Sequence, residues 1–116
     1  RLVRLAGTEQ AEKDEFCIVS LNMKEGILLC KGKGNPDWNY SSAHGCGRIL
    51  TRSASSRLNL KRFQQEMEGV YSTCVVKETL DESPMAYRSS DLVKKCLDSS
   101  VEIIEQLKPI INVKGI

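Results

Sequence analysis

Two short apolar runs near the start of the chain limit most strongly what it can fold into. Residues 16–20 read FCIVS and residues 26–30 read GILLC, and both runs are rich in side chains that favour strands. Each run has the usual length of a β-strand. Residues 22–25, NMKE, lie between them and have the character of a turn. The sequence therefore predicts two strands separated by a turn.

The size of the chain indicates one unit. It has 116 residues, of which 41% are hydrophobic, and this is enough for one core. We therefore expect residues 1–116 to form a single unit, either one domain or part of one. The chain carries 17 Lys and Arg against 15 Asp and Glu, a net charge of +2. Composition alone therefore does not indicate a nucleic-acid-binding protein, and any basic surface must be local.

Cysteine usage and the lack of long apolar runs bear on the compartment. The five cysteines are an odd number, are widely spread and form no Cys-x-x-Cys pair, and there is one histidine. This argues against an autonomous zinc site and for a reduced, cytoplasmic protein. The sequence has no signal-peptide pattern and no apolar run long enough to cross a bilayer, so we expect no membrane partner.

Two helices are predicted in the middle of the chain. After Gly47 the helix breakers stop, and Arg48 and Arg52 follow each other at i, i+4, so we predict a helix that begins near Gly45. Asn59 is a suitable N-cap for a second helix over residues 60–68, LKRFQQEME, which Gly69 would end.

A third helix is predicted near the C-terminus. Ser89 or Ser90 can cap it, and a break near Ser99 and Ser100 is an alternative within it. Its apolar side chains recur at spacings of three and four residues, as in an amphipathic helix: Leu92, Val93, Cys96, Leu97, Val101, Ile104 and Leu107.

The remaining segments are predicted as strands and loops. Residues 70–76, VYSTCVV, predict a strand, and residues 110–115 predict a last strand after Pro109 ends the third helix. Residues 31–39 and 81–87 contain the Gly, Pro, Asn and Asp residues typical of loops. The predicted fold class is α+β, with a mixed sheet and helices.

The segment SSAHGCGR holds the only histidine, His44. Glycines at 45 and 47 leave backbone N–H groups uncovered, and a helix that starts there would add the positive end of its dipole, which together form a phosphate cradle. Arg48 and Arg52 would add cationic anchors for phosphate oxygens. A lone histidine near glycines is more often an ordinary loop residue, and Gly-x-Gly alone is a weak signal. The residues by themselves leave both interpretations open.

Five segments in one order resemble a known family. They read NMKEG (22–26), GKGNPDWN (32–39), AHGCGR (43–48), LDESPMAYR (80–88) and LKPIINVKG (107–115). Together they resemble the C-terminal portion of the RtcB family of RNA ligases. In that family the histidine segment commonly reads His-Gly-Ala-Gly-Arg, the proline loop reads like Asp-Glu-Ala-Pro-x-Ala-Tyr-Lys, and the chain ends in Lys-Gly.

The resemblance implies an RtcB-type fold and an RNA ligase activity. Family members use GTP and manganese (Mn2+) to join an RNA 3′-phosphate or 2′,3′-cyclic phosphate to a 5′-hydroxyl, in tRNA splicing and RNA repair. The implied role of His44 is to accept GMP covalently, through attack of a neutral imidazole nitrogen on the α-phosphate of GTP. GMP then passes to the RNA 3′-phosphate. The implied RNA partners are tRNA halves or broken RNA ends.

The resemblance also assigns nucleotide-binding residues. Cys46 and Gly47 match the loop against the nucleotide, Tyr87 and Lys114 match residues on its guanine side, and Asn22 matches a nucleotide-contacting serine. Without the resemblance, Lys114 is interpreted as part of a solvated tail and Tyr87 as a half-buried loop aromatic.

Four further side chains each have two interpretations. We expect Arg48 and Arg52 to face phosphate rather than to form a solvated helix stripe. Trp38 and Tyr40 can stack on RNA bases or pack on their own turn.

The chain departs from the family in three places. Cys46 replaces the usual alanine and places a thiol beside the nucleotide, and Ile27 lies near the position of a second nucleotide-facing serine. The family's manganese ligands, an aspartate, a cysteine and several histidines, lie upstream of this region. We therefore expect the metal ligands outside this chain, the remainder of the ligase chain as a partner, and no ligase activity from the isolated 116 residues. The alternative is a non-catalytic RtcB-derived module that binds nucleotide or RNA or only packs against another chain.

Overall fold

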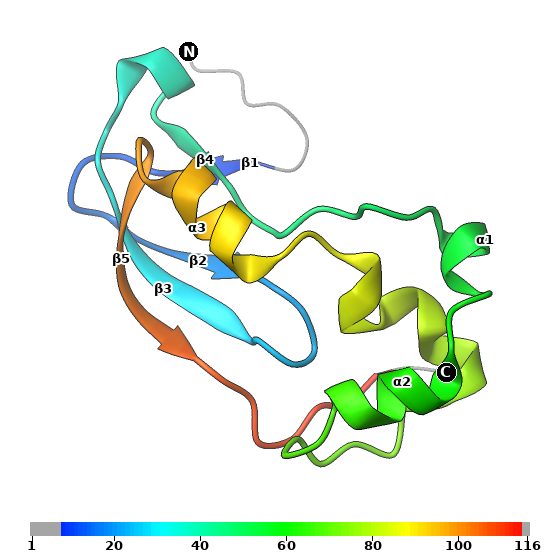
Figure 1. Cartoon of the computed structure of the whole chain (residues 1–116). Coiled ribbons are helices and arrows are strands. Elements are labelled where there is room, and N and C mark those ends of the chain that lie inside the picture. Colours follow the sequence, from blue (N-terminus) through cyan, green and yellow to red (C-terminus); the bar gives the residue numbers. More distant parts are fainter. Residues whose placement is uncertain (1–7, 115–116) are drawn as a thin grey trace.

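The computed structural model describes residues 8–114 (Figure 1). Helices and strands share this part of the chain, which confirms the α+β class. The strands are β1 (Thr8–Gln10), β2 (Phe16–Ser20), β3 (Ile27–Gly32), β4 (Ser41–Ala43) and β5 (Val101–Leu107). The α-helices are α1 (Arg52–Ser55), α2 (Leu60–Glu66) and α3 (Ser90–Leu97), and the 3₁₀ helices are η1 (Pro36–Trp38), η2 (Lys77–Glu82) and η3 (Pro84–Ala86).

The strands of the described residues pair in antiparallel fashion. β2, β3 and β5 form a three-stranded sheet with β3 in the centre, and β1 pairs with β4. Within residues 8–114, parallel pairing is confined to two isolated bridges, Ser20 with Gly45 and Tyr71 with Ile111. The mixed sheet predicted from the sequence is therefore wrong for residues 8–114, because every pair of strands there is antiparallel and the two parallel bridges are isolated.

The β2–β3 hairpin forms where the apolar runs predicted two strands. Val19 lies opposite Leu28, and both side chains are fully buried. The Asn22 side chain closes the turn by accepting hydrogen bonds from two backbone N–H groups, at 2.9 and 2.8 Å. Gly26 has a φ of +81°, and a Cβ there would overlap the carbonyl oxygen of Leu107. Only glycine fits this position without strain.

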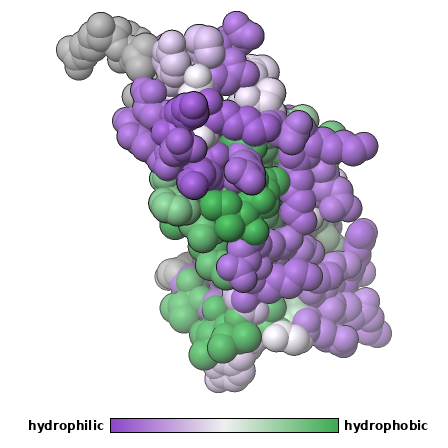
Figure 2. Space-filling model, turned by 90° about the vertical axis from the view of Figure 1, so that its left-hand side faces the viewer, coloured by the Kyte–Doolittle hydropathy of each residue, from purple (hydrophilic) through white to green (hydrophobic). Residues whose placement is uncertain are grey.

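The main core lies between the three-stranded sheet and α3, which covers one face of it (Figure 1). Its buried members come from the residue after β1, the hairpin, the histidine segment, α3 and β5, namely Ala11, Cys17, Val19, Leu21, Leu28, Cys30, Cys46, Val93, Leu97 and Val101. The opposite face of the sheet carries exposed apolar side chains, including Phe16 (66% exposed) and Ile18 (50%). Figure 2 shows hydrophobic residues gathered on one side of the molecule among hydrophilic ones.

A second buried cluster lies at the other end of the molecule, around α2. Phe63 of α2 and Met67, the C-cap residue of α2, pack with Met23 of the hairpin turn and Leu80 of η2. Asn59 caps α2 as predicted, because its side chain accepts a hydrogen bond from the backbone N–H of the third helical residue at 3.2 Å. The helix ends at Glu66, two residues before the predicted end, and Gly69 has the expected positive φ, +90°.

The helix predicted to begin near Gly45 is wrong. The backbone of residues 47–49 pairs with the chain near Tyr87: the N–H of Ile49 donates to the carbonyl of Ala86 at 3.0 Å, and the N–H of Arg88 donates to the carbonyl of Gly47 at 3.1 Å. Because these groups pair across the molecule, they are not available for helical hydrogen bonds. The helix that does form, α1, begins only at Arg52.

The third predicted helix is correct in its first half only. Ser89 caps α3, whose last residue is Leu97, so the alternative of a break near Ser99 and Ser100 is confirmed. The prediction of helix over residues 101–107 is wrong, because this segment is β5 and pairs with β3. This pairing gives hydrogen-bond partners to the N–H and C=O groups along one edge of β3, which a helix over residues 101–107 would leave unpaired.

The strands predicted over residues 70–76 and 110–114 are also wrong, and residue 115 of the second prediction lies outside the described residues. Tyr71 and Ile111 form an isolated bridge, with hydrogen bonds of 2.9 Å from Tyr71 N to Ile110 O and from Asn112 N to Tyr71 O. The loop predicted over residues 81–87 is ordered as the end of η2 and as η3. None of the helices in residues 8–114 is long and apolar enough to span a membrane.

Candidate functional site

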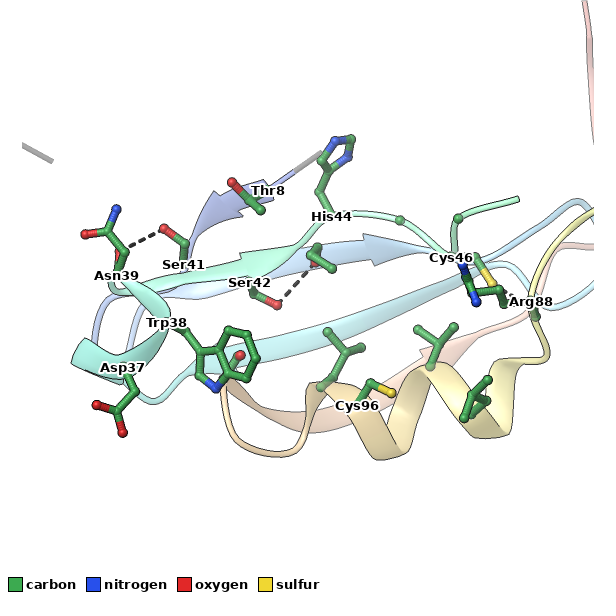
Figure 3. Close-up of a pocket in the computed structure, with 17 residues that line it drawn as sticks. Thr8, Asp37, Trp38, Asn39, Ser41, Ser42, His44, Cys46, Arg88 and Cys96 are labelled. Atoms are coloured by element: carbon green, nitrogen blue, oxygen red, sulfur yellow. Dashed lines mark hydrogen bonds between the residues drawn. The ribbon is translucent and has the colours of Figure 1, made fainter. Parts of the chain in front are cut away.

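The histidine segment forms an exposed link between β4 and the residues that pair with the chain near Tyr87. The N–H of Ser20 donates to the carbonyl of His44 at 3.1 Å, and this bond holds the segment against the end of β2. The imidazole of His44 is exposed and projects away from α3 (Figure 3). Its backbone is therefore fixed while its ring is accessible to a ligand.

The glycines next to His44 do not form the predicted cradle at a helix start. No helix begins there, so a helix dipole does not act on this loop. Gly47 does have a φ of +72°, and a Cβ at this position would lie 3.3 Å from Arg88 Nε. This left-handed backbone conformation favours glycine.

Cys46 is buried and points its thiol into the protein. Its Sγ donates to the carbonyl oxygen of Arg88 at 2.9 Å. Burial raises the pKa of this thiol, and the nearby Arg88 charge opposes the shift. The thiol therefore stays protonated near neutral pH and acts as a tie between two loops.

A cleft of about 700 Å³ brings the predicted nucleotide-binding residues together. His44, Asn22, Cys46, Gly47, Tyr87 and Lys114 all line it, and so does Ile27. These residues come from the hairpin turn, the histidine segment, the segment after η3 and the C-terminal segment. The oxygen of the Asn22 carboxamide is occupied within the turn, so its amide nitrogen is the group that can contact a ligand.

The two arginines predicted to face phosphate are paired with acidic residues. Arg48 Nη1 donates to the carbonyl oxygen of Asp81, and Nη2 donates to the Tyr87 hydroxyl at 3.1 Å and to Glu82 Oε1 at 3.3 Å. The guanidinium also lies over the Tyr87 ring, 4.9 Å from its centroid. Arg52 Nη1 contacts Asp81 Oδ2 at 2.7 Å and Glu82 Oε1 at 2.9 Å. Neither arginine lines the cleft, and their contact with phosphate stays a prediction.

Sequence reasoning missed Glu82, which lines the cleft and connects these groups. Its Oε2 accepts a hydrogen bond from the Tyr87 hydroxyl at 2.9 Å and lies 3.7 Å from Lys114 Nζ. Burial raises the pKa of Glu82, but hydrogen bonds from Arg52 and Tyr87 and the charges of Lys114 and Arg48 outweigh it, so the pKa lies below 4.5. The signal in the sequence was an acidic residue within LDESPMAYR, five positions before the tyrosine assigned to the nucleotide.

Tyr87 is half-buried, and its hydroxyl lies between a carboxylate and a guanidinium. Burial raises its pKa, and the hydrogen bond to Glu82 and the charge of Glu82 raise it further. The phenol is therefore protonated across the physiological range and acts as a hydrogen-bond donor.

Lys114 is held in place by a buried cysteine. The Cys74 thiol donates to the carbonyl oxygen of Lys114 at 3.1 Å, and its sulfur lies 3.4 Å from the Lys114 backbone nitrogen, which donates to it. That backbone N–H lowers the pKa of Cys74. These contacts bring the C-terminal segment back to the cleft, so Lys114 is not part of a solvated tail.

A second cleft, of about 860 Å³, lies on the α3 side of the histidine segment (Figure 3). Residues 44–47 line both clefts, and Leu92, Val93 and Leu97 of α3 form an apolar wall. Trp38 lines this second cleft and is 56% exposed. Tyr40 lines neither cleft. Base stacking by either aromatic stays a prediction.

No metal centre is apparent in the described part of the chain. Residues 8–114 contain no group of three or more His, Cys, Asp or Glu side chains that could hold an ion. The predicted location of the manganese ligands outside this chain is not tested by these residues.

Comparison with known proteins agrees with the sequence motifs. A family model described as tRNA-splicing ligase RtcB matches residues 4–115. RNA-splicing ligase RtcB and RNA-splicing ligase RtcB1, from two strains of Escherichia coli, are each 28% identical to the chain over 109 residues. The match covers 94% of the chain and 27% of each relative. The chain thus spans about a quarter of the length of these relatives.

Proposed function

The chain belongs to the RtcB family of tRNA-splicing ligases, and from this membership we propose that it is the histidine-bearing part of a GTP- and manganese-dependent RNA ligase. The ligase would join RNA 3′-phosphate or 2′,3′-cyclic phosphate ends to 5′-hydroxyl ends. Its substrates would be tRNA halves or broken RNA, and the remainder of the ligase would supply what these residues lack.

One observation carries the proposal: His44 shares a single cleft with all five residues predicted to bind the nucleotide. Their positions, from Asn22 to Lys114, span most of the chain, so only folding brings them together. The cleft volume, about 700 Å³, lies within the usual range for sites that bind small molecules and cofactors. The Lys114 ammonium group on its wall suits the acceptor atoms of a nucleotide.

In the proposed reaction, a neutral ring nitrogen of His44 attacks the α-phosphate of GTP. A nitrogen–phosphorus bond forms while the bond to pyrophosphate breaks. The RNA 3′-phosphate then takes the GMP group from the histidine, and attack by the RNA 5′-hydroxyl releases GMP as the new phosphodiester forms. The exposed ring of His44 at the edge of the cleft is accessible to both nucleotide and RNA.

The described residues do not fit a manganese site. No set of three or more potential ligands occurs among residues 8–114, and three or more protein ligands are typical of catalytic metal sites. Manganese would therefore have to be held by residues outside this range.

The test measures covalent labelling with GTP radiolabelled at the α-phosphate, in the presence of manganese. We expect no label on the 116-residue chain alone. We expect label on a fusion in which this chain replaces the matching segment of the Escherichia coli relative. His44→Ala should abolish the label, and Lys61→Ala, at an exposed position on α2 that lines neither cleft, should retain it. Label that persists in the His44→Ala fusion would refute the role of His44.

A non-catalytic nucleotide-binding module is the second candidate, and one observation favours it. Arg48 and Arg52 are both engaged by carboxylates and lie outside the cleft, so the described residues present few cations to a triphosphate. This candidate predicts that the chain binds GMP, while a folded fusion accepts no label.

A further inference from the structure

Glu82 connects three distant segments of the chain through one carboxylate. Oε1 receives Arg48 and Arg52, at 3.3 and 2.9 Å, and Oε2 receives the hydroxyl of Tyr87 at 2.9 Å and faces Lys114 Nζ at 3.7 Å. Both oxygens therefore have two partners each, which is the number of lone-pair directions a carboxylate oxygen offers.

The local backbone fixes where this carboxylate lies. Glu82 is the last residue of η2, and Pro84 begins η3 two residues later. Leu80 of the same helix is buried against α2, and this packing holds η2 in place. The side chain of Glu82 is 26% exposed. A carboxylate in such a position has a fixed geometry because several hydrogen bonds restrain it.

Charge accounts for why the group remains ionised. Three cations, Arg48, Arg52 and Lys114, surround it, and Asp81 is the second acid, bonded to Arg52. Without Glu82, three positive charges and one negative charge would share this region. The cations would then repel one another, and Tyr87 and Lys114 would lose the partner that aligns them.

We infer that Glu82 is a positioning residue for nucleotide binding, which holds the Tyr87 hydroxyl and the Lys114 ammonium against the guanine side of the cleft. This inference rests on the proposed function, because it assigns Tyr87 and Lys114 to the nucleotide base. Glu82 acts through these two side chains, and its own oxygens are already occupied by them and by the arginines.

A role in positioning and a role in charge alone predict opposite results. If Glu82 only adds a negative charge, its neutralisation removes repulsion and strengthens binding of the anion GMP. If it positions Tyr87 and Lys114, neutralisation weakens binding. Binding of guanosine distinguishes the positioning role from the charge-only role, because guanosine has the base but no phosphate. Positioning predicts an equal loss for guanosine and GMP, whereas charge predicts no change for guanosine.

The experiment measures the dissociation constants of GMP and guanosine for the 116-residue chain by titration calorimetry. We expect Glu82→Gln to raise the dissociation constants of both ligands by about tenfold, since hydrogen bonds to a charged group are lost. Glu78→Gln, at an exposed position in the same helix η2 that lines neither cleft, should leave both constants unchanged. Unchanged or tighter GMP binding by Glu82→Gln would overturn the inference.

A spectroscopic measurement tests the contact between Glu82 and Tyr87, on which positioning depends, without any ligand. Because Glu82 raises the pKa of Tyr87, Glu82→Gln should shift one of the three tyrosine ionisations, followed by ultraviolet absorbance, to lower pH. No shift would also overturn the inference. If the unaltered chain binds neither GMP nor guanosine, the proposed nucleotide cleft itself is refuted. If the unaltered chain binds GMP and guanosine and Glu82→Gln has the same dissociation constants, only the role of Glu82 is refuted.

Discussion

Replacing Phe63 by alanine tests whether the α2 cluster is a packed core. Phe63 is fully buried and packs with Met23, next to the cleft residue Asn22, and with Leu80, two residues before Glu82. A buried aromatic side chain removes about 150–250 Å² from water. At about 25 cal/mol per Å² this corresponds to about 4–6 kcal/mol, an upper value because unfolded chains already bury some surface.

We therefore expect Phe63→Ala to lower the free energy of unfolding by about 4 kcal/mol, within the range known for such truncations. Net stabilities of domains are about 5–15 kcal/mol, so the variant should fold but be marginal. Urea denaturation measures the change. With a slope of about 2 kcal/mol per molar urea, the midpoint should fall by about 2 M while the slope stays constant.

Two control variants make this result specific. Phe63→Leu keeps most of the apolar volume and should lose about 1 kcal/mol. Phe16→Ala removes the same side chain from a position that is 66% exposed and should lose about 1 kcal/mol or less, including its contact with Lys31. Equal midpoint shifts for Phe63→Ala and Phe16→Ala would refute the view that the α2 cluster is a packed core.

Three other predictions concern titration and thiol reactivity. Burial, assisted by the charge of Glu9, raises the pKa of Cys17 to about 12, and burial raises that of Cys30 to about 11. Stability should therefore be full below about pH 9.0 and fall as pH rises towards 11, and a urea midpoint that is constant from pH 8 to pH 10.5 would contradict this. Cys96 is the exposed cysteine and the other four are buried, so Ellman's reagent should modify one thiol quickly and four only on unfolding. Loss of the fast phase in Cys96→Ser is the check, and several fast thiols would contradict the burial pattern. Because the pKa of Glu82 lies below 4.5, its stabilising contribution is present above that pH and is lost as pH falls through the folded-state pKa. The stability difference between the unaltered chain and Glu82→Gln should therefore shrink in acid, and a difference that stays constant down to pH 3 would contradict it.

Local patterns predicted the elements whose stabilising contacts are close in sequence. The β2–β3 hairpin, the Asn59 cap of α2 and the Ser89 cap of α3 all depend on bonds between residues a few positions apart. Cross-strand apolar pairs and capping side chains can be recognised from spacing alone. These predictions were confirmed for that reason.

Elements that depend on distant pairing were predicted wrongly. Residues 101–107 have apolar positions that fit both a helix and a strand. They form a strand because their backbone groups pair with those of β3. The segment after Gly47 lacks helix breakers, but its backbone groups pair with residues 86–88. Neither partner can be identified from local sequence, because periodicity describes one segment at a time.

The candidate site divides in the same way. Motif order identified His44, Asn22, Tyr87 and Lys114, and the fold places all four on one cleft. Glu82 was missed because its role depends on where its partners lie. The phosphate contact predicted for Arg48 depends equally on tertiary contacts.

By itself, the sequence determined the α+β class, the hairpin, two helix caps and the family, because each depends on nearby residues or on the order of motifs. Only the tertiary structure decided that Cys74 bonds to the backbone of Lys114 and that Glu82 contacts both Lys114 and Tyr87. It also decided that Arg48 and Arg52 contact the other oxygen of the Glu82 carboxylate. The physical reason is that a buried or half-buried charge takes whichever opposite charge the fold brings within reach. In this chain those partners are separated by up to 66 sequence positions, from Arg48 to Lys114.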